Sequence, residues 1–253
     1  MIIIDGGDGT VRDVLSLAPR HFPDGLPQLL VVPSGKTNAL ALDLGIPRHW
    51  TVQDALSTLG TARIVTRRPL EIRYEGARSR RLHGFLFGTG AFVRATQLAQ
   101  KVHGVGAFNG LAVGLSLVGA IGQTLFGGRH NAWRRGEPMT IDLGDGQAAE
   151  RQFYLVVGST LERLPLGLKP FGPVRSGLKL LGIDAPPRYL PLSAPALIAG
   201  SDRQWLSEAG YKRAHTDSFR LKLGSSFVLD GETFPGGDLS IGQGAPIDFV
   251  VPG

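Results

Sequence analysis

The chain has 253 residues, carries a formal net charge of +6 and contains no cysteine. This length suffices for one large or two small domains, and the lack of cysteine excludes disulfides and thiolate metal sites. An apolar content of 42% with 36 glycines excludes a largely disordered chain and is typical of a globular one with many turns. No signal peptide is visible, and the cysteine-free composition fits a reducing cytoplasm, so we expect a cytoplasmic protein.

Basic residues are concentrated in the middle of the chain. Residues 63–135 contain twelve Lys and Arg but two acids, whereas residues 1–62 contain four basic and six acidic residues. A basic middle suggests an anionic partner, which is a nucleotide, an acidic membrane surface or nucleic acid. A solvated basic face would give the same pattern, so charge alone does not choose among these partners.

The first element is a strand–turn–helix unit over residues 2–15. Its three successive isoleucines predict a buried strand, and apolar residues at helical spacing predict a helix that begins near Thr10. A strand, a glycine turn and a helix N-terminus together bind phosphate well, because free N–H groups and the helix dipole both favour an anion. The turn between strand and helix holds three glycines, which allow a ligand to approach the backbone closely: Gly6, Gly7 and Gly9.

One carboxylate, Asp8, stands inside this turn and would repel a phosphate on its own. It fits a phosphate site if it holds Mg²⁺ bound to the phosphates or orients the phosphoryl acceptor. The alternative is an ordinary Asp-Gly turn without chemical function. Three glycines and an acid within five residues favour the phosphate site.

A second strand–turn–helix unit follows at once. Residues 28–32 predict a buried strand, residues 33–38 a glycine turn, and residues 39–42 the start of a helix that Gly45 and Pro47 end. In an open parallel sheet both turns face one crevice, where ligands bind. Within the second turn Lys36 is then placed to meet phosphate and Asn38 to offer a hydrogen bond. Alternatively, Lys36 is a solvated loop charge and Asn38 a helix N-cap.

From Ala62 onward, alternation and short apolar runs predict an antiparallel sheet, with a domain boundary near residue 61. We therefore expect an α/β unit over residues 1–61 and a β-rich unit over residues 62–253. Helices are expected at 51–59 and 195–200, and a loop at 158–172. The expected strands are 64–65, 70–74, 82–87, 139–143, 153–157, 219–223, 227–229 and 248–251.

Residues 104–128 carry no charge, which satisfies the length criterion for a membrane-spanning helix. Eight glycines make the stretch weakly hydrophobic, so we favour a helix packed closely on the second domain. A true membrane span and a membrane-contacting lid are the alternatives. Residues 130–135, with a tryptophan beside two arginines, suit a lipid headgroup surface.

Two carboxylates, Asp230 and Glu232, flank a glycine at the end of the strand 227–229. In extended backbone both side chains would project to the same side, unless a turn at Gly231 alters this. Paired acids can divide roles, one staying ionised on a metal while the other accepts a proton from a hydroxyl. The alternative is an Asp-Gly hairpin with a solvated glutamate.

Three motifs occur together in an order known from one family. They are Gly6-Gly7-Asp8-Gly9-Thr10, the Pro-x-Gly-x-x-Asn turn at 33–38 with Leu44-Gly45-Ile46-Pro47, and Leu229-Asp230-Gly231-Glu232. In these motifs the sequence resembles the catalytic domain of diacylglycerol kinases, which bacterial soluble lipid kinases and sphingosine kinases share. The first motif also occurs in NAD kinases and phosphofructokinases, whereas the three together are much more specific.

This resemblance implies an α/β fold in which a nucleotide-binding α/β domain with a shortened parallel sheet precedes a larger, mostly antiparallel β-sandwich domain with helices, as in NAD kinase-like folds. It implies ATP and Mg²⁺ as cofactors in the crevice between the domains. The implied nucleotide contacts are Gly6, Gly7, Asp8, Gly9, Thr10, Gly35, Lys36 and Asn38. The implied catalytic residues are Asp8, Asp230 and Glu232, with Asp8 and Asp230 at the metal and Glu232 as the proton acceptor.

The sequence departs from the family pattern at several positions. Members begin with a further strand–helix–strand–helix and an Asn-Pro-x-x-Gly loop before the first motif, so we expect a shortened first domain. Lys36 stands where a threonine is usual, and Ala39 where an aspartate is common. The family's Asp-Asp-Gly metal motif would fall at residues 175–177, where both acids are absent, so we predict no structural Mg²⁺ site there.

The favoured function is an ATP-dependent lipid kinase that phosphorylates a lipid hydroxyl, such as that of diacylglycerol. The expected partner is a lipid substrate at a membrane surface and not nucleic acid, with the protein cytoplasmic or peripheral at the membrane. A catalytically impaired lipid- or membrane-binding relative is the alternative, and an NAD kinase fits the late Asp-Gly-Glu motif and the basic middle poorly. Homodimer formation stays open.

Overall fold

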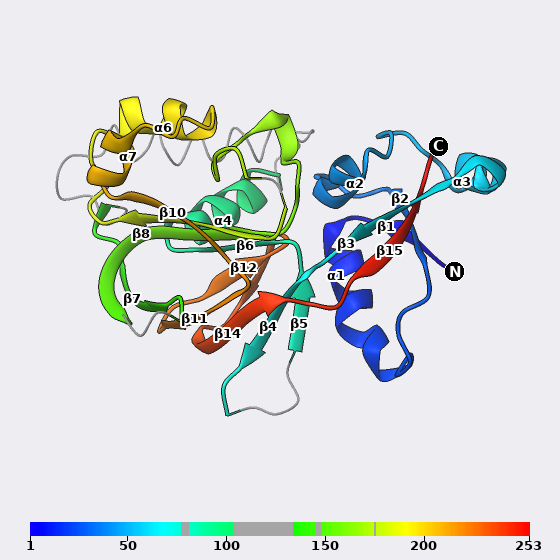
Figure 1. Ribbon diagram of the computed structural model, residues 1–253, viewed down its shortest axis with the longest axis horizontal. Helices are drawn as coiled ribbons and strands as arrows, with labels where there is room; N and C mark the ends of the chain where they lie inside the picture. The colour runs from blue at the N-terminus through cyan, green and yellow to red at the C-terminus, as the bar shows by residue number, and fades with distance from the viewer. Residues whose placement is uncertain (77–80, 104–133, 145–147, 175) are drawn as a thin grey trace.

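The computed structural model describes residues 1–76, 81–103, 134–144, 148–174 and 176–253 of the chain (Figure 1). Its described strands form two sheets, one of four strands and one of eleven. Figure 1 shows the small sheet and both marked chain ends on the right, and the large sheet on the left. The expected mixed α/β fold, with a small parallel sheet and a large antiparallel sheet, is confirmed.

The small sheet has the strand order β1-β2-β15-β3. Strands β1 and β2 pair in parallel, with Ile2 opposite Leu29, and β15 pairs in parallel with the other edge of β2. The fourth strand, β3, joins β15 in the antiparallel direction. The bounds of these strands are β1 Ile2–Gly6, β2 Leu29–Pro33, β3 Arg63–Arg67 and β15 Ile247–Val251.

Both strand–turn–helix units predicted at the start of the chain are present. Helix α1 begins at Asp8, two residues before the expected start, because Gly7 already serves as its N-cap in extended backbone. Helix α2 ends at Gly45, whose φ of 77° is the left-handed conformation that suits glycine. The helical segments of this half are α1 Asp8–Leu17, η1 Ala18–Arg20, α2 Ala39–Leu44, α3 Val52–Ser57 and η2 Leu59–Thr61.

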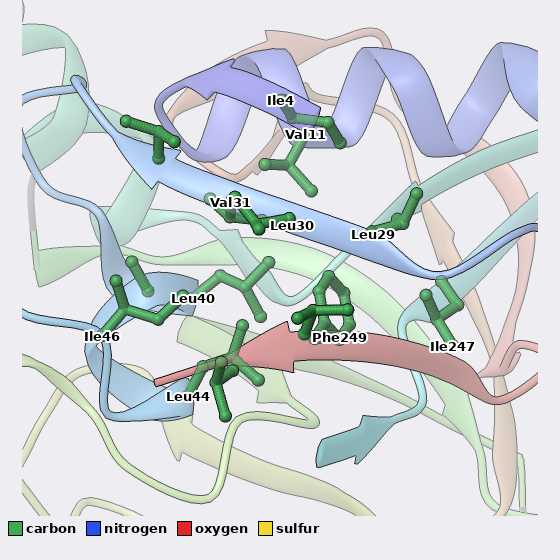
Figure 2. Close-up of a cluster of buried hydrophobic side chains, with 14 of the residues drawn as sticks. Ile4, Val11, Leu29, Leu30, Val31, Leu40, Leu44, Ile46, Ile247 and Phe249 are labelled. Atoms are coloured by element: carbon green, nitrogen blue, oxygen red, sulfur yellow. The ribbon is translucent and has the colours of Figure 1, made fainter. Parts of the chain in front are cut away.

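One apolar core holds the small sheet and its helices together. All five residues of β2 are buried, as expected for a strand with covered faces. Figure 2 shows side chains of β1, β2, α1, α2 and β15 meeting in this cluster. Phe249 of β15 and Phe85 also belong to it, so the core includes residues from late in the chain and from the large sheet. The core therefore fixes both glycine turns relative to the large sheet.

The large sheet runs in the order β13-β12-β6-β8-β7-β11-β14-β4-β5, and β9 pairs with β8 and β10 beside this path. The strand pairings of this sheet are antiparallel throughout the described part of the chain. The strand expected at 82–87 is instead two strands that separate at Phe85. The strands of the large sheet are β4 Leu70–Tyr74, β5 Arg81–Gly84, β6 Leu86–Thr89, β7 Glu137–Asp142, β8 Ala149–Ser159, β9 Leu178–Asp184, β10 Tyr211–Thr216, β11 Ser218–Leu223, β12 Phe227–Leu229, β13 Glu232–Phe234 and β14 Gly237–Gln243.

Helices cover part of the large sheet, and a second apolar core lies between them and the strands β8, β9 and β10. The helix expected at 195–200 is α6, which begins five residues earlier and contains Pro195. The helical segments of this half are α4 Ala91–His103, η4 Pro165–Gly167, α6 Leu190–Ile198 and α7 Gln204–Glu208. None of the helices in the described part of the chain has the length and apolar character needed to cross a membrane.

The division between the two sheets does not coincide with the boundary expected at residue 61. Strands β3 and β15 both lie within residues 62–253, yet both belong to the small sheet. The chain therefore passes from the small sheet to the large one after β3 and returns to it before β15. The reason is that β2 needs a partner on its second edge, which a late strand supplies.

Several expectations fall on residues outside the described ranges. The uncharged stretch 104–128 and residues 130–133 lie there, and so does Arg175 of the segment compared with the family's metal motif.

A charged cluster joins β4 to β5 on the large sheet. Glu71 lies opposite His83 across the two strands, and its carboxylate is 3.4 Å from Nε2 of that histidine. Arg73 also pairs with this carboxylate, and Arg81 lies 3.9 Å from it. The hydrogen bond from His83, reinforced by Arg73 and opposed by burial, lowers the pKa of the Glu71 carboxyl to about 2.

We expect Glu71→Gln to lower the free energy of unfolding at pH 7 by about 1–3 kcal/mol, because the ion pairs to a largely buried carboxylate are lost. The folded-state pKa is depressed, so the wild-type advantage is complete above pH 4.5 and fades as the pH falls towards 2. Urea unfolding at several pH values measures this. The control is Glu75→Gln, an exposed position in the turn directly after the same strand. Equal stability of the two variants at pH 7 would contradict the prediction.

Candidate active site

The two glycine turns lie against each other, backbone to backbone. A Cβ added to Gly35 would stand 2.3 Å from Cα of Gly7, a separation that real side chains do not reach. A Cβ on Gly7 would likewise stand 2.9 Å from Cα of Gly35. The structure therefore puts both turns at the same edge of the small sheet, and both positions need glycine for this close approach.

Asp8 connects these turns through its side chain. Its carboxylate oxygens accept hydrogen bonds from the backbone N–H groups of Ala39 (2.9 Å) and Leu40 (3.0 Å), at the start of α2. Asp8 thus satisfies two N–H groups that the helix itself leaves free. Burial raises the pKa of the Asp8 carboxyl, although these two backbone donors oppose the rise. The residue is therefore both a helix cap and a buried acid.

The other predicted nucleotide contacts surround this point. Asn38 adopts φ 50° and donates from Nδ2 to the carbonyl oxygens of Pro33 and Gly35, at 3.1 and 2.7 Å. It shapes the second turn and does not cap α2 with its side chain. Lys36 and Thr10 are exposed, and Gly6 is buried against Thr10. The structure gathers these residues at one edge of the small sheet.

Asp230 and Gly231 form the two-residue turn of a hairpin between β12 and β13. Both have positive φ, 47° and 83°, which is the conformation of a tight type I′ hairpin turn. The extended arrangement considered for Asp230 and Glu232 is therefore wrong, and the turn at Gly231 sets their directions. As a result Asp230 points inward while Glu232 begins the next strand.

The carboxylate of Asp230 is buried and binds backbone N–H groups at the break between β5 and β6. It accepts hydrogen bonds from Phe85 N at 3.0 and 3.1 Å and from Leu86 N at 2.9 Å. Burial, followed by the negative charge of Asp8, raises the pKa of the Asp230 carboxyl to about 7. The chain thus places Asp8 and Asp230 within electrostatic reach of each other, although 221 positions separate them.

Glu232 lies on the outer side of this hairpin, with 60% of its side chain exposed. Its carboxylate pairs with the guanidinium of Arg12, which comes from α1 and is 4% exposed. Arg12 follows Asp8 by four residues, so one helix carries both side chains on the same face. Helix α1, which follows the first turn, is therefore in direct contact with the hairpin.

The residues present fit a magnesium ion. Asp8 and Asp230 are two partly buried carboxylates, and the charge of Asp8 helps to raise the pKa of Asp230, so a cation between them would relieve the repulsion. No group of three or more potential ligand side chains occurs in the described ranges. Proteins commonly hold Mg²⁺ through one or two carboxylates together with substrate phosphates and water.

An apolar pocket is lined in part by backbone partners of the two carboxylates, although neither carboxylate lines it. It has a volume of about 160 Å³ and its lining is almost entirely hydrophobic. Ala39, whose N–H binds Asp8, and Leu86, whose N–H binds Asp230, both line it. From there the pocket extends between β8, β9 and the helices α4 and α6, where it reaches Ala194 and Leu197.

Residues 1–68 match the model of the diacylglycerol kinase catalytic domain. A curated diacylglycerol kinase of Bacillus subtilis (strain 168) is 42% identical to this chain over 73 residues, which are 28% of this chain and 22% of that relative. The resemblance to diacylglycerol kinases seen in the motifs is thereby confirmed. Because the match spans about a fifth of that relative's length, a diacylglycerol kinase activity is a proposal for this chain.

Solved structures of similar shape extend the likeness to the whole chain. A structure of a proposed diacylglycerol kinase from Bacillus anthracis strain Sterne aligns with a TM-score of 0.65 at 16% identity, over 99% of this chain and 78% of that one. Another structure, of a diacylglycerol kinase from the same organism, aligns with a TM-score of 0.59 at 15% identity, over 99% and 76%. At these identities the comparison establishes the fold, which this chain shares with these diacylglycerol kinase structures.

Two features of the site escaped the motif analysis. Arg12 is an arginine in an amphipathic helix, a type of residue that is usually solvated, and no local signal marks it as buried. The N–H groups of Phe85 and Leu86 carry no side-chain signal either. The break in the alternating pattern at Phe85 was the one available clue, since a strand that stops pairing frees its backbone donors.

Proposed function

We propose that this protein is an ATP-dependent lipid kinase, which transfers the γ-phosphate of ATP to a lipid hydroxyl such as that of diacylglycerol. The observation that carries the proposal is the position of the apolar pocket, which begins at the residues whose N–H groups bind Asp8 and Asp230. A ligand with a hydroxyl at these carboxylates and a hydrocarbon chain in the pocket is a lipid alcohol.

In the proposed reaction the lipid hydroxyl gives its proton to the carboxylate of Glu232 while its oxygen forms a bond to the γ-phosphorus. The bond from that phosphorus to the bridging oxygen breaks, and ADP leaves with the bonding electrons. The N–H groups of the first glycine turn and of the start of α1 would bind the phosphates, and Lys36, which is exposed in the second turn, would add a positive charge. Asp8 and Asp230 would hold Mg²⁺, which neutralises the charge that develops on the phosphates.

The proposed substrate also implies that the protein binds to a membrane surface during turnover. Diacylglycerol is confined to a bilayer, so an enzyme that uses it must meet the membrane surface. The excess of basic residues in the stretch 63–135 favours an acidic leaflet, because each lysine or arginine close to anionic lipid adds attraction. We therefore propose a peripheral protein that binds membranes reversibly.

A test of the proposal measures transfer of radiolabelled phosphate from ATP to diacylglycerol in vesicles with Mg²⁺, comparing wild type with Ala194→Phe. Ala194 is buried and lines the pocket, so a phenyl ring there occupies space meant for the acyl chain. We expect at least a tenfold higher KM for long-chain diacylglycerol, a smaller effect with short chains and an unchanged KM for ATP. The control is Leu192→Phe, which enlarges an exposed side chain of the same helix outside the pocket.

Two outcomes would contradict the proposal. Vesicle binding without any phosphate transfer or ATP binding by calorimetry would favour the catalytically impaired relative. Phosphorylation of NAD in place of the lipid would favour the NAD kinase. Equal kinetics of wild type and Ala194→Phe would show that the lipid substrate does not bind in this pocket.

A further inference from the structure

A buried arginine joins the first turn to the hairpin that carries both late carboxylates. Nη1 of Arg12 donates to the carbonyl oxygen of Leu229 at 3.3 Å, and Nη2 donates to Asp13 at 2.7 Å. The guanidinium also pairs with Glu232 and lies 5.3 Å from the ring centroid of Phe234. Its contacts on the hairpin therefore bracket the turn at Asp230 on both sides.

The placement of this arginine is costly unless it has a specific partner. A guanidinium that is 4% exposed has lost most of its water, and buried ion pairs contribute little stability compared with apolar packing. Phe234 lies near the flat face of the guanidinium, the carbonyl oxygen of Leu229 accepts from Nη1, and Asp13 accepts from Nε and Nη2. Nη2 also donates to the Glu232 carboxylate, which is the charged contact that Arg12 makes on the hairpin. Because these contacts fix the guanidinium, it can in turn fix the position of a carboxylate that binds to it.

Glu232 is the partner of Arg12 whose position matters for the proposed reaction. Glu232 is mostly exposed and has three rotatable side-chain bonds, so without a partner its carboxylate would sample many positions. A proton acceptor is effective when it stays within hydrogen-bond reach of the hydroxyl, and a displacement of about 1 Å can cost a factor of 10² in rate. The ion pair to Arg12 removes this freedom.

We propose that Arg12 is a positioning residue, which holds the carboxylate of Glu232 towards the lipid hydroxyl. The inference rests on the proposed kinase function and adds to it a residue outside the glycine turns and the carboxylate motif. Arg12 also connects α1 to the hairpin of β12 and β13 through direct contacts. A shift of α1 on nucleotide binding would be transmitted through the guanidinium to the proton acceptor.

A double-mutant cycle tests this, with kcat for lipid phosphorylation measured in wild type, Arg12→Gln, Glu232→Gln and the double variant. We expect Arg12→Gln to lower kcat by roughly 10- to 100-fold in the wild-type background, with KM for ATP unchanged. In the Glu232→Gln background the same change should have less than a twofold effect, because there is no carboxylate left to position. Arg12→Lys should recover part of the rate, since it keeps the charge without the planar fork.

Two further measurements separate positioning from loss of structure. Arg20→Gln removes an equal charge at an exposed site after α1 and should leave kcat unchanged. Urea unfolding of each variant shows how much protein is folded under assay conditions. A purely structural arginine would lower kcat equally in both backgrounds, and that additive result would overturn the inference. A wild type without lipid phosphorylation would overturn the proposed function and the inference with it.

Discussion

Glu232→Gln is expected to lower the rate of lipid phosphorylation by roughly 10²–10⁴, the usual contribution of a general base. A lipid hydroxyl is a poor nucleophile at neutral pH, and glutamine cannot take its proton. The side chain is largely exposed at the start of β13, so the substitution should leave the fold unchanged. Single-turnover measurements with radiolabelled ATP at saturating Mg²⁺ give the rate, and calorimetry gives the affinity for ATP, which should not change.

The matched control for this variant is Glu208→Gln, at the end of α7 and far from both glycine turns in the chain. It removes the same charge and should retain the full rate. A Glu232→Gln protein that turns over within threefold of wild type would show that another group accepts the proton. The hairpin would then be a structural element next to the site.

Asp8→Asn is expected to have a double effect, because the Asp8 carboxylate binds two backbone N–H groups and is also the proposed ligand of Mg²⁺. Loss of its charge removes a partner of Mg²⁺ and should lower turnover by roughly 10²–10³. In addition, an amide presents an NH₂ group to one of the two N–H donors at the start of α2, which should cost about 1–3 kcal/mol of unfolding free energy.

The two effects separate experimentally. Urea unfolding gives the loss of stability, and turnover against Mg²⁺ concentration gives the loss of chemistry at a temperature where the variant is fully folded. Asp5→Asn, an exposed position on β1, is the control for charge. Wild-type turnover of Asp8→Asn with an unchanged Mg²⁺ dependence would show that Asp8 acts only as a helix cap.

The first part of the fold could be predicted because its signals are local. A run of three isoleucines, three glycines within four positions and apolar residues at helical spacing each specify one element in a short window. The same holds for α3, where Thr51 and Asp54 form a capping box. These elements appear in the structure within about two residues of their expected positions.

The remaining part could not be read from local patterns. Nothing in residues 247–251 distinguishes a strand of the small sheet from a strand of the large one, because the choice depends on which edge is open in the folded chain. The hairpin turn at Asp230 was ambiguous for a related reason, since an Asp-Gly pair fits both a strand end and a turn. Arg12 and the backbone donors of Phe85 became recognisable only through their distant partners.

The position of β15 between β2 and β3 has a consequence for how the molecule is made. The nucleotide-site half cannot complete its sheet until residues 247–251 have left the ribosome, even though β1 and β2 are synthesised first. Until then one edge of β2 has no strand beside it, and the apolar core shared with Phe249 is unfinished. The residues proposed to bind the phosphates would therefore be ordered last, and removal of the final strand should abolish a proposed site that lies more than 200 residues away.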